Sequence, residues 1–228
     1  MPTTGLVVNA VPASCAGWEW KRWGSRFAVS EDGLVATMGG PLTNPVDSDD
    51  EAYDEGFGNE PLQTVTCGQP MTEGRHYWEV ELTVRGDEDF STVLFGAVRP
   101  GQDCDSTGNI EASSTSHFMI MSDQEGGNSA VSLFGNGKSH NADADGCDGD
   151  VSHLDYDEEY FFKQGDRIGF LLDLDAGWLR FYRNDKRLRQ EFASGVTGPL
   201  LRCAELYSEG GVVTALPGAE MPADAGGL

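Results

Sequence analysis

The sequence is poor in basic residues. It has 15 Lys and Arg against 38 Asp and Glu, which gives a formal net charge of −23 over 228 residues. Such a charge repels nucleic acid and anionic membrane surfaces, so we expect neither as a partner. No stretch approaches the ~18 consecutive apolar residues of a membrane helix, and the N-terminus lacks the basic start and apolar run of a signal peptide. We therefore expect an intracellular, cytoplasmic protein.

Cysteine pairs with the spacing of a zinc or redox site are also missing. The five cysteines lie far apart, and no two of them form a C-x-x-C pair. An odd number of widely spaced cysteines is typical of free thiols in a reducing compartment. The sequence contains no internal repeat and no amphipathic helix of three turns. These features do not define an oligomeric state.

Signatures of catalysis are weak. There is no Gly-x-Ser-x-Gly motif, and the Gly-Lys-Ser at 137–139 lacks the earlier glycine of a phosphate-binding loop, because Ser132 stands at that position. Asp173 and Asp175 are two residues apart and could share a proton or a cation, but at a hairpin end one of them more often caps backbone amides. We predict a protein that is not an enzyme and carries no cofactor.

The sequence does contain many short apolar runs separated by Gly, Asp, Asn and Ser, a pattern typical of strands joined by tight turns. In residues 74–86, Trp78, Val80 and Leu82 fall on one face and acids fall on the other, which predicts a strand with its acids at the surface. Residues 165–188 alternate as clearly. About a dozen strands without a helical crossover predict an all-β fold of antiparallel sheets packed face to face.

Aromatic residues concentrate near the start of the predicted domain. Trp18, Trp20 and Trp23 could form a binding platform, but core filling is the favoured interpretation, because each ring buries on the order of 200 Å². We predict that Trp78 lies in the core for the same reason. Residues 31–33 (Glu-Asp-Gly) separate two apolar runs and predict a hairpin.

Two acidic segments carry most of the negative charge. Residues 47–60 hold seven acids and residues 143–159 hold eight, with no Lys or Arg in either. The stretch 141–150 looks like a calcium loop, but Ser152 stands where an EF-hand needs a bidentate Glu, and no flanking helices are predicted. An EF-hand is therefore excluded. A weak cation site remains open at four carboxylates: Asp143, Asp145, Asp148 and Asp150.

Two separate parts of the chain resemble the SPRY (B30.2-like) domain family. The matching segments are Gly-x-x-Tyr-Trp-Glu-Val at 74–80, a glycine-bearing strand at 94–101, Gly-Asp-x-Ile-Gly at 165–169, Asp-x-x-x-Gly at 173–177 and Phe-Tyr-x-Asn at 181–184. Asp185 departs from the pattern, because the family commonly has Gly there. Asp can adopt the same backbone region, so we expect the turn to survive.

The resemblance covers roughly residues 18–216. It implies a bent sandwich of two antiparallel sheets, similar to the concanavalin-type jelly roll of the legume lectins. We accordingly predict a poorly ordered N-terminal segment at 1–16, a SPRY-like domain at 17–217 and a short C-terminal tail at 218–228.

The resemblance also implies a binding module, in which variable loops at one side of the sandwich recognise a protein or peptide. The acidic loops favour a basic partner, whose approach they would accelerate. We predict that contacts come from two loops beside the motif-bearing strands: Arg99, Pro100, Gln102, Asp103, Tyr207, Ser208 and Glu209. Tyr207 is the predicted anchor, since aromatics at a polar rim often dominate binding.

A lectin-like carbohydrate binder is the alternative. The same sandwich architecture hosts sugar binding, so the fold does not decide between the two functions. In this alternative the acidic loop 141–152 would hold a weakly bound calcium ion.

Overall fold

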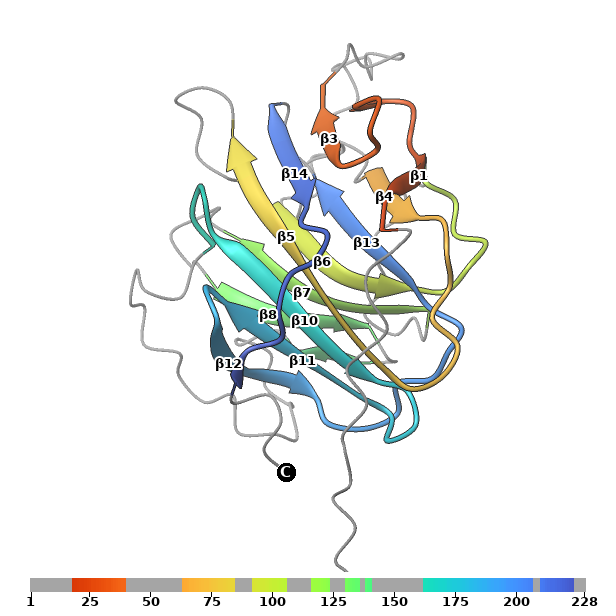
Figure 1. Ribbon diagram of the computed structural model, residues 1–228, viewed down its shortest axis with the longest axis vertical. Coiled ribbons are helices and arrows are strands. Elements are labelled where there is room, and N and C mark those ends of the chain that lie inside the picture. Colours follow the sequence, from red (N-terminus) through yellow and green to blue (C-terminus); the bar gives the residue numbers. More distant parts are fainter. Residues whose placement is uncertain are drawn as a thin grey trace, which may run out of the picture.

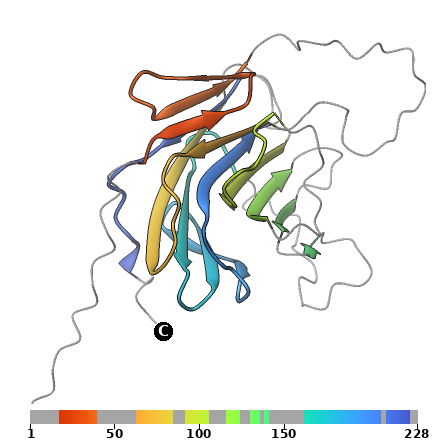
Figure 2. The ribbon, with the colours of Figure 1, turned by 90° about the vertical axis from the view of Figure 1, so that its right-hand side faces the viewer.

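Two antiparallel sheets lie face to face in the computed structural model (Figures 1 and 2). The structure describes residues 18–39, 63–84, 92–105, 116–123, 130–135, 138–140, 162–206 and 210–223. Within these ranges there is no α-helix, and hence no helix long and apolar enough to cross a membrane. The predicted all-β sandwich of two antiparallel sheets is confirmed.

The first sheet has seven strands in the described part of the chain. In spatial order they are β1 (Trp20–Trp23), β4 (Gln63–Cys67), β13 (Leu201–Leu206), β6 (Thr92–Val98), β7 (His117–Asp123), β8 (Ala130–Gly135) and β9 (Lys138–His140). The C-terminal strand β13 therefore lies between strands from the first half of the chain. Such long-range pairing explains why the strand order could not be derived from local patterns.

The second sheet also has seven strands among the described residues. In order they are β12 (Lys186–Phe192), β11 (Trp178–Arg183), β10 (Arg167–Asp173), β5 (Arg75–Val84), β14 (Gly211–Ala215), β3 (Val35–Met38) and β2 (Phe27–Val29). β2 and β3 form the hairpin predicted around Gly33, with Val29 opposite Ala36. The two strongly alternating segments, β5 and β10, are neighbours at the centre of this sheet.

The core between the sheets is built from aromatic rings. Trp78 of β5 is fully buried and stacks on Phe170 of β10, with centroids 4.9 Å apart and planes 9° from parallel. Phe118 of the first sheet meets Phe192 of the second edge to face at 5.6 Å. Each ring removed from water stabilises the fold by about 2–3 kcal/mol. The prediction that Trp78 belongs to the core is confirmed.

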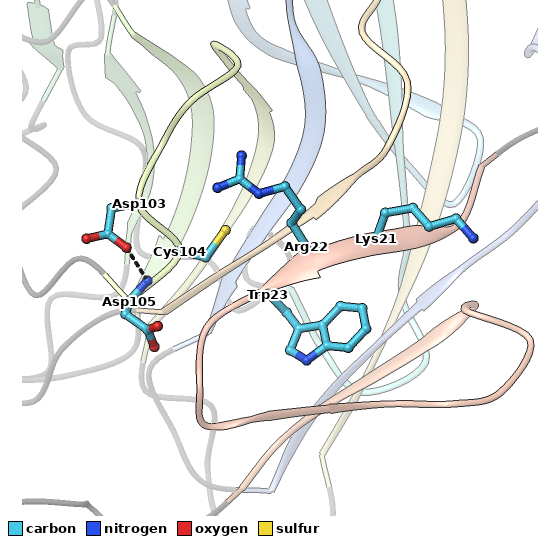
Figure 3. Close-up of a pocket in the computed structure, with 6 residues that line it drawn as sticks. All are labelled: Lys21, Arg22, Trp23, Asp103, Cys104 and Asp105. Atoms are coloured by element: carbon cyan, nitrogen blue, oxygen red, sulfur yellow. Dashed lines mark hydrogen bonds between the residues drawn. The ribbon is translucent and has the colours of Figure 1, made fainter.

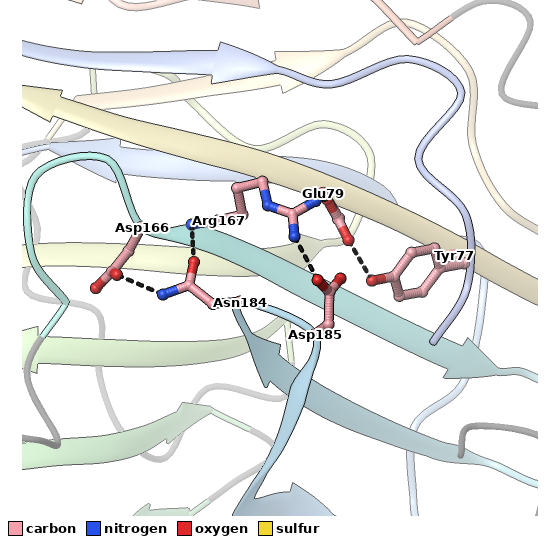
Figure 4. A network of polar contacts seen from close by, with 6 residues as sticks. All are labelled: Tyr77, Glu79, Asp166, Arg167, Asn184 and Asp185. Carbon is pink, nitrogen blue, oxygen red and sulfur yellow. Dashed lines mark hydrogen bonds and ion pairs between the residues drawn. The ribbon is translucent and has the colours of Figure 1, made fainter. Parts of the chain in front are cut away.

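The outer face of the second sheet carries a polar network made by the motif residues (Figure 4). The hydroxyl of Tyr77 donates to Glu79 Oε1 at 2.6 Å, and Arg167 donates to Glu79 Oε2 at 3.3 Å and to Asp185. The nearby Glu79 carboxylate raises the pKa of Arg167, and burial raises the pKa of Tyr77. A methyl group at Gly169 would lie 2.6 Å from the Tyr77 hydroxyl, so this position requires glycine.

A second set of contacts fixes the β11–β12 turn to the start of β10. The amide of Asn184 donates to Asp166 Oδ1 at 2.7 Å, while Asn184 Oδ1 accepts from the Arg167 backbone N–H at 3.0 Å (Figure 4). Asn184 and Asp185 have φ of 50° and 67°, as a two-residue hairpin turn requires. The turn therefore survives Asp185, as predicted.

Glu79 of β5 is not at the surface, where the alternation placed it, while Glu81 is partly exposed. Glu79 is only 3% exposed. After β14, the Leu216 N–H donates to the Glu79 carbonyl at 3.1 Å, and Ala219 and Met221 then pack against a cluster that contains Tyr77 and Trp178. Figure 1 shows this segment crossing the outside of the sheet. The prediction of a surface position was therefore wrong for Glu79, because a distant part of the chain covers this part of the face.

Candidate functional site

The loop after β6 contains four of the predicted contact residues. Pro100 and Asp103 are exposed and Gln102 is partly exposed. The guanidinium of Arg99 instead donates to the Thr197 carbonyl at 3.0 Å and to its hydroxyl at 2.7 Å. Arg99 therefore joins the end of β6 to the loop before β13, while the residues that follow it face solvent.

This loop forms a pocket together with the edge strand β1 (Figure 3). The pocket has a volume of about 310 Å³. Its lining residues come from two segments far apart in the sequence: Lys21, Arg22, Trp23, Asp103, Cys104 and Asp105. Of the predicted contact residues, Asp103 lines the pocket, and the carbonyl of Gln102 accepts from the Arg22 guanidinium at 3.2 Å.

A β-bulge in β1 affects the directions in which its side chains point. Trp20 pairs with Cys67 on β4, but the next paired residue, Arg22, is opposite Thr66, so Lys21 is the additional residue. Cross-strand partners share a face of the sheet. Arg22 and Trp23 consequently point to opposite sides of β1, as Figure 3 shows, with Arg22 directed toward Cys104.

The three N-terminal tryptophans divide between two roles. Trp18 and Trp20 are each 1% exposed and meet edge to face, with centroids 5.0 Å apart. Trp23 is 43% exposed, the one large hydrophobic side chain in the described ranges that is open to solvent. Core filling is therefore right for Trp18 and Trp20 and wrong for Trp23. Trp23 is the last residue of the edge strand β1, and the sequence carries no signal of that position.

Hydrogen bonds give the two pocket aspartates fixed positions. Asp105 Oδ1 accepts from the Ser25 backbone N–H at 2.5 Å and from the Gln63 amide at 3.2 Å. Asp103 Oδ1 accepts from the Asp105 N–H at 3.1 Å. Both carboxylates use one oxygen in these bonds, and neither forms an ion pair with another described residue. These bonds attach the loop to β4 and to the segment that follows β1, and leave negative charge on its surface.

A buried carboxylate lies behind the pocket wall. Thr64 of β4 donates its backbone N–H to the Cys104 carbonyl at 3.1 Å and its hydroxyl to Glu205 Oε1 at 2.9 Å. Glu205 is 2% exposed, and burial raises its pKa to about 7. Burial also raises the pKa of the Cys104 thiol. Cys104 is a free thiol, as are Cys67 and Cys203.

The other candidate chemical groups have structural roles. Asp173 accepts from Arg75 Nε at 2.6 Å and from the Ala176 N–H, and Asp175 accepts from the Gly74 N–H. Burial alone would raise the pKa of Asp173, but these donors hold it below its usual value. The capping interpretation of this acid pair is confirmed. Among the described residues, no histidine lines the pocket.

Several predicted site residues lie outside the described residues. They include the second contact loop, Tyr207, Ser208 and Glu209, and the candidate cation ligands Asp143, Asp145, Asp148 and Asp150. The pocket also has lining residues that the sequence did not single out as a site. Lys21, Arg22, Cys104 and Asp105 carry no motif, and only the pairing of β1 with β4 brings them to the loop.

Comparisons with known proteins agree with this architecture. The SPRY domain matches residues 75–214, and no curated protein sequence matches the chain. The crystal structure of the TRIM65 PSpry domain is similar at 17% identity and a TM-score of 0.53, over 85% of this chain and 86% of that chain. The SPRY domain of human HERC1 gives 18% identity and a TM-score of 0.51, over 84% of this chain and 92% of that chain.

Part of a larger protein, stonustoxin, has the same fold. Its structure gives 18% identity and a TM-score of 0.51, over 85% of this chain but 25% of that chain. At such identities the likeness shows the fold alone. The family match, in contrast, spans more than half of the sequence and includes the strands that carry the Tyr77–Glu79 and Asp166–Asn184 contacts. This chain belongs to the SPRY domain family.

Proposed function

We propose that the chain is a non-enzymatic protein-interaction module, which holds a protein or peptide partner against Trp23 and the loop at 99–105. SPRY domains are generally interaction modules. The observation that carries the proposal for this chain is the exposure of Trp23, at 43%, in a pocket beside the predicted contact loop. Exposed aromatics next to polar groups are frequent binding hot spots.

The chemistry of the pocket favours binding over catalysis. The lining residues that the structure describes include no histidine or serine that could act as base or nucleophile. The thiol of Cys104 is 7% exposed, and its raised pKa keeps it protonated near neutral pH, which makes it a poor nucleophile. The loop carboxylates are tied to backbone N–H groups and so serve to shape a surface.

Photo-crosslinking tests the proposal. A benzophenone amino acid replaces Trp23 in one protein and the exposed Lys186 of β12 in a matched control, and both are irradiated in an extract of the source cells. We expect position 23 to give a discrete crosslinked protein, identifiable by mass spectrometry, that is absent at position 186. The same products at both positions, or none at position 23, would contradict a partner site here.

A further inference from the structure

The pocket has an unequal charge distribution. The ammonium group of Lys21 forms an exposed ion pair with Glu19, a residue outside the pocket lining. Arg22 points toward Cys104, on the opposite side of β1 from the indole of Trp23 (Figure 3). Asp103 and Asp105 each keep one carboxylate oxygen without a hydrogen bond to any described residue. Among the described residues, the two loop carboxylates thus have no ion-pair partner, while the Lys21 ammonium is directed to Glu19.

A carboxylate is held next to the segment that carries the exposed aromatic ring. Asp105 accepts from the N–H of Ser25, two residues after Trp23, so the carboxylate is fixed beside the segment that carries the indole. An exposed indole attracts a cation over its face, and a neighbouring carboxylate strengthens that attraction. Because Trp23 is 43% exposed, its ring is open to such a ligand.

We propose that this pocket accepts a cationic side chain of the partner, an arginine by preference, placed over the indole of Trp23 and within reach of the carboxylates of Asp103 and Asp105. The inference rests on the proposed function, for which it names the chemistry that is recognised. A volume of about 310 Å³ is large enough for one long side chain.

Arginine fits the pocket better than lysine does. Its planar guanidinium stacks on an aromatic ring, is less strongly hydrated than an ammonium group, and can donate to two carboxylates at once. The net charge of −23 attracts cations to the whole molecule before contact. An anionic side chain is disfavoured, because the carboxylates of Asp103 and Asp105 lie in the same pocket lining and would repel it.

A peptide titration followed by NMR tests the inference without knowledge of the partner. The probe is a pentapeptide with one arginine between glycines, acetylated and amidated at its ends. The control peptide carries citrulline, which has nearly the same shape but no charge. The indole signal of Trp23 is assigned by its absence in Trp23→Phe. We expect the Trp23 signal to shift when the arginine peptide is added. We expect the citrulline peptide to have an affinity at least about tenfold lower.

Charge-removing variants locate the contact. Asp103→Asn and Asp105→Asn keep an acceptor oxygen for the local hydrogen bonds, so each should weaken arginine-peptide binding several-fold without unfolding the loop. Glu220→Gln, an exposed acid on the far segment after β14, is the matched control and should have no effect. Equal binding of the citrulline peptide, equal effects of all three variants, or no shift up to about 10 mM peptide would overturn the inference.

Failure of the inference can be told apart from failure of the proposed function. If the arginine peptide does not bind but Trp23→Ser abolishes binding of the crosslinked partner, the pocket is a partner site and only the cation is wrong. If the arginine peptide binds but Trp23→Ser leaves partner affinity unchanged, the proposed function is overturned, and the cation cannot be assigned to the partner.

Discussion

The hydroxyl of Thr64 donates to the buried carboxylate of Glu205 at 2.9 Å, while the backbone N–H of the same threonine donates to Cys104 in the pocket wall at 3.1 Å. One residue of β4 thus connects a buried ionisable group to the loop that lines the candidate site. No cation in the described ranges forms an ion pair with Glu205. Burial in this environment raises its pKa from 4.5 to about 7.

Stability should therefore fall as the pH rises from 4.5 to about 7. Between these values folded Glu205 keeps a proton that the unfolded chain has lost, so each rise in pH favours unfolding, and below 4.5 the contribution is constant. The shift corresponds to about 3 kcal/mol over the whole window, at about 1.4 kcal/mol per pH unit. The measurement is urea unfolding of the native protein and of Glu205→Gln at several pH values.

The quantity that tests this prediction is the difference in unfolding free energy between the native protein and Glu205→Gln at each pH. Burial also lowers the pKa of His76 and of His117, but both histidines titrate in the two proteins alike and cancel in the difference. We expect Glu205→Gln to remove most of the fall between pH 4.5 and 7. A difference between the proteins that does not vary with pH would show that Glu205 ionises normally.

Thr64→Val removes the hydroxyl donor to Glu205. We expect this change to lower the unfolding free energy by an amount that depends on pH. An ionised buried carboxylate that loses its donor costs about 1–3 kcal/mol. Burial raises the pKa of Glu205 and the Thr64 hydroxyl lowers it, so the variant should also move the pH-dependent window upward. We expect a larger loss of unfolding free energy at pH 8 than at pH 5. An equal loss at both would indicate a packing defect alone.

Much of the fold could be predicted from the sequence because its signals are local. The alternation at Trp78, Val80 and Leu82 identified a central strand and its buried face, and all three side chains are at most 1% exposed. The positive φ of Asn184 and Asp185 could be predicted because these two residue types favour a two-residue hairpin turn. The motifs of the family resemblance are also local, and contacts such as that between Tyr77 and Glu79 give them a structural reason.

The candidate site could be predicted only in part. The contact loop was found because it follows a motif strand, but its partner in the pocket is β1, about 80 residues earlier in the chain. Trp23 lies at the end of β1, and the position of β1 at the edge of the sheet depends on its pairing with β4, which no local pattern contains. Glu79 was misplaced for the same reason, since the segment that covers it comes from residues after β14.

Gly96→Ala should destabilise the sandwich severely. A methyl group at Gly96 of β6 would lie 2.2 Å from the carbonyl oxygen of Phe118 on β7, so the two central strands would have to separate. We expect a loss of about 3 kcal/mol or more in unfolding free energy. Gly39→Ala is the matched control, because nothing lies within 4 Å of its added methyl group. Similar stability of the two variants would show that β6 and β7 are not as close as described.

Asp185→Gly should change stability little, although it restores the residue that the family commonly has. Glycine adopts the φ of 67° more easily than aspartate, but the substitution removes the exposed ion pair with Arg167. These effects oppose each other, and we expect a net change within about 0.5 kcal/mol. Asp185→Val, with a branched side chain at positive φ, should lose about 1–2 kcal/mol. Thermal unfolding of both variants would show the order, and a stable valine variant would contradict the described turn.

The affinity of the purified crosslinked partner shows whether Trp23 and the loop at 99–105 form the partner site. Isothermal titration calorimetry would compare the native protein with Trp23→Ser, Trp23→Phe and Lys186→Ser, after unfolding curves have shown that all are folded. We predict at least tenfold weaker binding for Trp23→Ser, a smaller loss for Trp23→Phe, and no change for Lys186→Ser. Native affinity in a folded Trp23→Ser protein would contradict the account.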